Sequence, residues 1–126
     1  MYFPDLHVED MHYGVKAIKV GWLDKGKPYT QWKKSDEEML AELIIKLEEI
    51  GPGIFTKGFH VCPFCAGEES SRQYIIKFKD GKTFYDAPEM ITHYIIEHNY
   101  LPPQEFIDAV MKYKNHDTRI CTQFFR

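Results

Sequence analysis

Two cysteines and two histidines have the spacing of metal ligands. Cys62 and Cys65 form a C-x2-C pair, which presents two sulfur atoms from one tight turn. His93 and His98 follow as an H-x4-H pair, within the range found in zinc sites. Zinc takes four such ligands in a tetrahedron, and a shell closed by four protein ligands is a structural one. The sequence therefore predicts one structural Zn2+ ion bound by two thiolates and two imidazoles.

The histidine spacing leaves the ligand set open. Residues five apart on an ideal α-helix differ in direction by roughly 140°, against about 40° for residues four apart. His93 and His98 therefore converge only if the last helical turn distorts or if His98 lies at the frayed helix end. His60, two residues before Cys62, is a further candidate that would replace either histidine.

Other chemistry of the cysteine pair fits the surrounding sequence less well. A redox C-x-x-C motif places its first cysteine at a helix N-terminus, but the acidic segment 66–71 that follows is a poor helix former. Zinc deaminases combine H-x-E with P-C-x-x-C. His7-Val8-Glu9 matches the first motif, but Val61 stands where the second has proline. Two buried free thiols would rarely occur at this spacing.

The elements between the two pairs predict how they meet. Residues 74–78 alternate as in a strand, Asp80-Gly81 is a hairpin turn signal, and residues 83–85 form the return strand. Pro88 suits the first position of a helix that runs to about Asn99 and carries both histidines. This order predicts an enlarged ββα zinc unit, composed of a knuckle, a β-hairpin and a helix.

The flanking segments complete an α+β domain. Residues 15–22 alternate as a strand, and residues 24–28 predict a turn. Ser35 is placed to cap an amphipathic helix that ends near Ile50, and a last helix follows Pro102-Pro103. We expect residues 1–126 to form a single zinc-binding domain. Within it, residues 1–13 are predicted to be an irregular arm and residues 115–126 an irregular tail.

Length and composition favour one small globular domain. The chain has 126 residues, of which 44% are hydrophobic, and a formal net charge of −3. That charge argues against a dedicated nucleic-acid binder. The sequence shows neither an apolar run of membrane-spanning length nor a signal peptide, so we expect a cytoplasmic protein. Cys121 makes the cysteine count odd, unlike a secreted disulfide framework.

Three stretches resemble the motifs of one protein family. Residues 22–28 match W-L-D-x-G-x-P, residues 58–65 match G-x-H-x-C-x-x-C, and residues 87–106 match A-P-x-x-I-x-H-Y-I-x-x-H-x-Y-x-P-P-x-x-F. The likeness spans roughly residues 18–111 and is to small uncharacterised bacterial cytoplasmic proteins. It implies that His60 and the four candidate ligands lie at motif positions. It implies no established activity, and the tail from Lys112 extends past the usual end of the family.

The first candidate function is a non-enzymatic module that engages a protein partner, of an immunity or regulatory type. Aromatic side chains would supply such a surface. The candidates are Tyr29, Trp32, Tyr94 and Tyr100. We expect this function, without membrane association and without enzymatic activity.

Two alternatives remain. One is a zinc-finger-like nucleic-acid-binding protein, although a solvated charged face explains the basic residues better. Its candidate basic patches are Lys25, Lys27, Lys33 and Lys34, or Lys112, Lys114, Arg119 and Arg126. The other is a metal-dependent hydrolase, in which three of the ligands bind and Glu89 or Glu97 acts as the base.

Overall fold

The fold is described from a computed structural model of the chain. It describes residues 2–53, 55–65 and 69–113, and within residues 55–60 and at residue 69 it describes the backbone alone. The predicted tail at 115–126, with Cys121, therefore lies outside the described residues. No helix in the described part of the chain has both the length and the apolar character needed to cross a membrane.

In the described part of the chain, five strands and three α-helices follow one another in the order ββαβββαα, which confirms the predicted α+β fold class. The strands are β1 (His7–Asp10), β2 (Lys16–Lys19), β3 (Phe55–Val61), β4 (Glu69–Lys77) and β5 (Thr83–Pro88). The α-helices are α1 (Glu37–Ile50), α2 (Ile91–His98) and α3 (Gln104–Lys112). Short 3-10 turns lie at His12–Gly14 and Lys34–Asp36.

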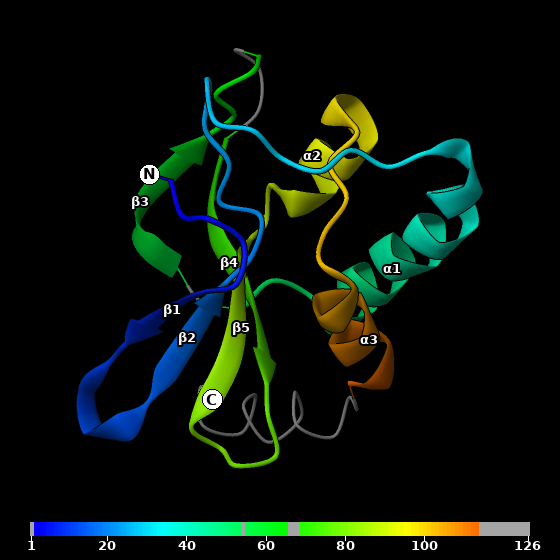
Figure 1. The fold of residues 1–126 in the computed structure, drawn as a ribbon. Coiled ribbons are helices and arrows are strands. Elements are labelled where there is room, and N and C mark those ends of the chain that lie inside the picture. The colour runs from blue at the N-terminus through cyan, green and yellow to red at the C-terminus, as the bar shows by residue number, and fades with distance from the viewer. Residues whose placement is uncertain (1, 54, 66–68, 114–126) are drawn as a thin grey trace.

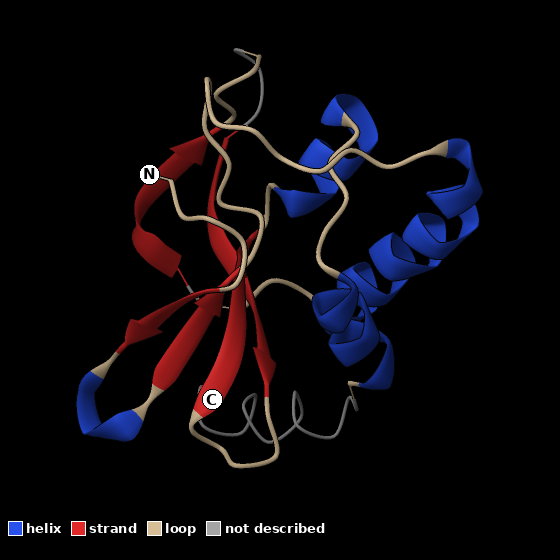
Figure 2. Cartoon of the chain, in the orientation of Figure 1, coloured by secondary structure: helices blue, strands red, loops and turns tan. Residues whose placement is uncertain are grey.

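One mixed sheet orders the strands β1-β2-β5-β4-β3. Neighbouring strands are antiparallel except β2 and β5, which are parallel; the long stretch of chain between these two provides the crossover that parallel pairing needs. The α-helices lie to one side of the sheet (Figure 1), and the β1–β2 hairpin extends away from them (Figure 2). The predicted hairpin is present, because β4 and β5 pair directly across the Asp80-Gly81 turn.

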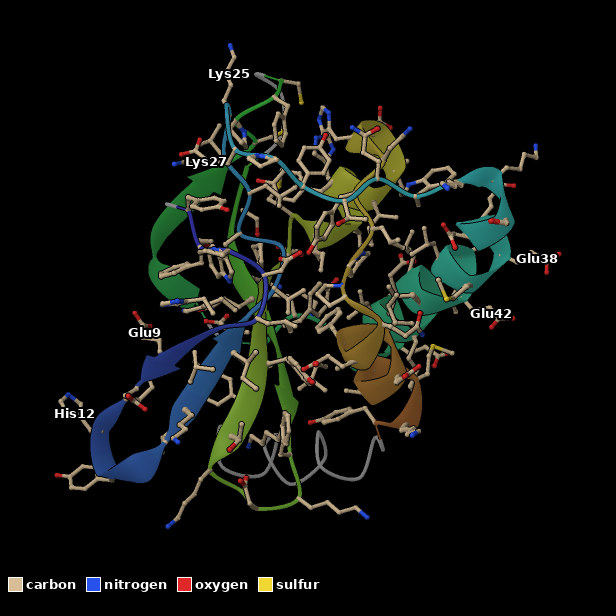
Figure 3. The ribbon with its side chains drawn as sticks, in the orientation of Figure 1. Glu9, His12, Lys25, Lys27, Glu38 and Glu42 are labelled. Atoms are coloured by element: carbon tan, nitrogen blue, oxygen red, sulfur yellow. The ribbon has the colours of Figure 1, made fainter. Side chains whose placement is uncertain are left out.

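The core forms between the sheet and the apolar stripes of the helices. The buried side chains of α1 recur at helical spacing, as predicted, and those of α3 include Phe106, which meets the Tyr85 ring edge-on. Glu38 and Glu42 project outward from the opposite face of α1 (Figure 3). The buried residues of α1 are Leu40, Leu43, Leu47 and Ile50.

Several predicted boundaries are wrong. The arm 1–13 is not wholly irregular, since β1 pairs with β2 at the sheet edge. The strand predicted over 15–22 ends at Lys19, because Gly21 has a φ of +79° and turns the chain against Ile91.

The predicted starts of two helices are also wrong. Pro88 ends β5 instead of opening α2, which begins three residues later. Ser35 makes no cap; the Asp36 carboxylate instead accepts the N–H of Lys33.

Two polar contacts, one buried and one partly buried, fix the sheet and the N-terminal arm. Lys19 and Asp86, register partners on β2 and β5, form a buried ion pair at 2.6 Å, and the Lys19 ammonium also lies 4.8 Å from the centre of the Phe3 ring. The Asp5 carboxylate accepts hydrogen bonds from the Gly21 N–H and the Tyr100 hydroxyl. Asp5 thus ties the arm to the residues just after α2.

Burial raises the pKa of Asp5 above its usual value of 3.8, and this outweighs the lowering by its two hydrogen bonds. A carboxyl group whose pKa is higher in the folded chain costs folding free energy once it ionises. We expect the free energy of unfolding of the wild type, relative to Asp5→Asn, to fall as pH rises from about 4 to neutrality. Denaturant unfolding at matched zinc concentration measures the difference. A free-energy difference between the wild type and Asp5→Asn that stays constant or rises with pH would contradict the raised pKa of Asp5.

Candidate metal centre

The cysteine pair lies in the connection between β3 and β4, and the histidines lie on α2. Cys62 directly follows the last residue of β3, so the strand pairing with β4 holds its backbone. His93 is in the first turn of α2 and His98 is its last residue. The β3–β4 connection and α2 lie at the same end of the molecule (Figure 1). The knuckle, hairpin and helix of the predicted zinc unit are thus present, with β3 as an additional strand that sequence analysis missed.

The four side chains converge on one point. Cys62 Sγ lies 3.4 Å from His98 Nε2, and Cys65 Sγ lies 3.3 Å from His93 Nε2. All four ligand atoms lie within 4.8 Å of one another. A tetrahedral zinc ion with bonds of about 2.3 Å to sulfur and 2.0–2.1 Å to nitrogen would hold sulfur and nitrogen about 3.6 Å apart. The donor types and separations therefore fit a zinc ion, although its presence stays a prediction.

The end of α2 explains how histidines five residues apart can converge. The carbonyl oxygen of Tyr94 accepts hydrogen bonds from the N–H groups of Asn99 and Tyr100, five and six residues later. Such bonds widen the last turn, and in a wider turn residues five apart come closer to the same face. Asn99 then leaves the helix in the left-handed conformation, with φ 57° and ψ 27°. The ring centroids of His93 and His98 are 5.1 Å apart.

Burial shifts the two inner ligands toward their neutral forms. Desolvation raises the pKa of the buried Cys62 thiol above its usual value of 9.0. Desolvation, followed by the charge of His93, lowers the pKa of His98 below 6.5. A metal ion between the ligands would reverse the first effect, because a coordinated thiol loses its proton. The neutral imidazole favoured at His98 is the form that binds a metal.

Aromatic rings cover the inner side of the cluster. The Phe64 ring, from between the two cysteines, lies 4.9 Å from the His98 ring and 6.0 Å from the Tyr94 ring. Cys65, by contrast, is exposed. The site therefore has a dry, packed side at Cys62 and His98 and an open side at Cys65.

A cysteine–histidine pair can also serve as a nucleophile and its base, and the Cys65–His93 distance would suit that role. Such a pair needs one cysteine and one histidine. Here Cys62 and His98 form a second pair at nearly the same distance, directed at the same point. A metal ion uses all four side chains, so the complete arrangement favours coordination.

The other candidate histidines are placed differently. His60 lies on β3, but its side chain is not described, so its role as a replacement ligand is untested. His7 lies on β1, at the opposite edge of the sheet from β3, and its ring stacks on Phe3. The H-x-E pattern of a deaminase is thus remote from the cysteine pair. His12 is in the β1–β2 turn, and His116 lies outside the described residues.

The predicted aromatic docking surface is wrong in part. Tyr94 and Tyr100 are fully buried and cannot contact a partner. Tyr29 and Trp32 are partly buried and hydrogen-bond to the backbone of α2. Sequence spacing gives no sign of this contact, because it joins segments more than sixty residues apart.

The predicted basic patches are only partly described. Lys25 and Lys27 project from the turn at 24–28, near the end of the molecule that holds the metal centre (Figure 3). Lys33, Lys34 and Lys112 are exposed. The remaining candidates, Lys114, Arg119 and Arg126, lie outside the described residues.

The family model described as Domain of unknown function (DUF7919) matches residues 1–111. The match includes the N-terminal arm and β1, beyond the stretch in which the sequence motifs were found, and it ends within α3. Neither a curated protein nor a solved structure matches the chain.

Unequal burial of the cysteines predicts unequal reactivity. In the metal-free full-length chain, we expect a maleimide to label the exposed Cys65 faster than the buried Cys62. Added zinc should slow both reactions by roughly tenfold or more, because coordinated sulfur is no longer free to react. Mass spectrometry of the labelled peptides distinguishes the two cysteines from Cys121. Labelling rates that zinc leaves unchanged would contradict the site.

Proposed function

We propose that this chain, which belongs to the DUF7919 family, is a small binding module whose fold is locked by one structural zinc ion. The convergence of two sulfur and two nitrogen atoms carries this proposal. The ion would join the β3–β4 connection to α2, two parts of the chain that are separated by β4 and β5. It would thereby add a cross-link to a domain of modest size.

The ligand set supports a structural role over a catalytic one. A catalytic zinc keeps a position open for water, whereas four protein ligands complete a tetrahedron. The Phe64 ring packs against the His98 ring on the inner side of the cluster. The identity of the ion rests on the donor chemistry, since two thiolates and two imidazoles in a tetrahedron suit zinc.

We expect a chelator to destabilise the purified protein. A ligand present at about a thousand times its dissociation constant adds about 4 kcal/mol to the folded state. For a domain of this size, that energy corresponds to a fall in Tm of roughly 10 °C or more upon zinc removal. Metal analysis should give about one zinc per chain. Thermal unfolding followed by circular dichroism, with and without chelator, measures the shift.

Matched variants make this test specific. Cys62→Ser should melt close to the chelated wild type and should not respond to chelator. His12→Ala, which changes an exposed histidine in the β1–β2 turn, should bind zinc and respond as the wild type does. Wild-type protein that binds no zinc, or that melts identically with and without it, would refute the structural role.

We further propose that the surface around the metal centre engages a protein partner. Two aliphatic side chains beside the ligands support this. Val61, directly before Cys62, is 50% exposed, and Ile96, between the two histidines, is 56% exposed. Apolar side chains that are exposed together mark contact surfaces, and we propose that these two form such a patch. The zinc ion would hold both of these elements in place.

Ile96→Asp tests the partner proposal, with Ile45→Asp as the matched control. Ile45 is 57% exposed on α1 and lies away from the ligands in the chain. We expect affinity capture from a cell extract to recover one stoichiometric protein with the wild type and with Ile45→Asp, but not with Ile96→Asp. If both variants recover the partner, or if neither does, the result would contradict a contact surface at Ile96.

A further inference from the structure

The C-terminal end of α2 is completed by a distant segment of the chain. Residues 29–32, here called the clamp segment, run alongside the residues that follow the helix. An isolated bridge pairs Gln31 with Tyr100 in antiparallel orientation. The N–H of Trp32 donates to the carbonyl oxygen of Asn99, and the N–H of Leu101 donates to the carbonyl oxygen of Thr30. The backbone of Asn99, immediately after His98, is thus fixed from outside the helix.

Two side chains of the clamp segment act on the helix itself. The last four carbonyl groups of an α-helix lack partners within the helix. The Tyr29 hydroxyl donates to the carbonyl oxygen of His98 at 2.9 Å, and the Trp32 Nε1–H donates to that of Ile95 at 2.7 Å. Both contacts fall in the turn that must widen for His98 to face His93. They stabilise carbonyl groups that the widened turn leaves without helical partners.

The clamp segment also contacts the cysteine side of the site. The Tyr29 ring lies 5.5 Å from the Phe64 ring, which stands between the two cysteines. Phe64 in turn contacts the His98 ring. Tyr29 therefore contacts Phe64 of the knuckle through its ring and hydrogen-bonds to His98, the last residue of α2, through its hydroxyl.

We propose that Tyr29 and Trp32 are positioning residues that set the direction of the His98 imidazole and so the affinity and geometry of the metal centre. This inference rests on the proposed metal function. On a regular helix His98 would point roughly 140° away from His93. The hydrogen bonds from Tyr29 and Trp32 hold the distorted helix end in place before the metal arrives. Part of the ordering that coordination requires is thereby already present in the metal-free chain.

Tyr29→Phe removes one hydroxyl and keeps the ring against Phe64. We expect this variant of the full-length chain to bind Zn2+ about tenfold more weakly, at the lower end of the range for groups that support metal ligands. The ligand-field spectrum of the Co2+-loaded variant should also differ from that of the wild type, because His98 approaches the metal differently. Trp32→Phe, which removes the donor to Ile95, should show the same two changes. Competition with a chromophoric chelator measures the affinity.

Tyr85→Phe is the matched control. The Tyr85 hydroxyl donates to Glu105 Oε1 at 2.9 Å, between β5 and α3 and outside the metal cluster. This variant should lose stability in the same way as Tyr29→Phe while keeping the wild-type zinc affinity and Co2+ spectrum. Equal affinities and spectra in all four proteins would overturn the positioning role and leave the metal site standing. Failure of the wild type to bind Zn2+ or Co2+ would refute the metal site and the inference together.

Discussion

The helix end at His98 is the constraint on which the rest of the site depends. A regular α-helix cannot direct His93 and His98 at one ion, because the two residues differ by roughly 140° in direction. The chain meets this constraint by widening the last turn around the Tyr94 carbonyl group and by leaving the helix through a left-handed Asn99. Such an end exposes carbonyl groups that need partners, and groups from other segments supply them. The geometry of the metal centre is therefore a property of the surrounding fold and not of α2 alone.

Support for the helix end extends to the N-terminal arm. Tyr100, fully buried beyond Asn99, donates its hydroxyl to Asp5 in the N-terminal arm. Asp5 also accepts the N–H of Gly21, where the chain leaves β2. The Lys19 ammonium lies over the ring of Phe3 in the arm and also forms an ion pair with Asp86 on β5. A buried ion pair contributes little net stability but fixes register, because a misplaced partner would leave a charge buried alone. Asp5 thereby connects the residues after α2 to the end of β2.

The sequence predicted the parts of the fold that depend on local patterns. The apolar period of α1, the turn at Asp80-Gly81 and the spacing of the cysteines and histidines act over short stretches, and the structure bears out the elements and the convergence they predict. The missed features depend on distant segments. β1 and β3 are edge strands that form by pairing with β2 and β4, and Lys19 is buried because Asp86 lies beside it. The contact of Tyr29 with His98 joins residues 69 positions apart, so no window of sequence contains it.

The three motifs of the sequence can now be understood as parts of one arrangement. In W-L-D-x-G-x-P, the Trp22 indole donates to the carbonyl oxygen of Asp86, and Leu23 is buried in the core. Asp24 then accepts the N–H of Lys25 through its side chain, and Gly26 turns the chain with a φ of +85°. Residues 29–32, which follow this turn, lie against the end of α2. The cysteine motif and the histidine motif supply two candidate ligands each, and the tryptophan motif precedes the segment that hydrogen-bonds to His98. Because no single motif contains all four candidate ligands, the candidate metal centre requires the tertiary fold that brings the motifs together.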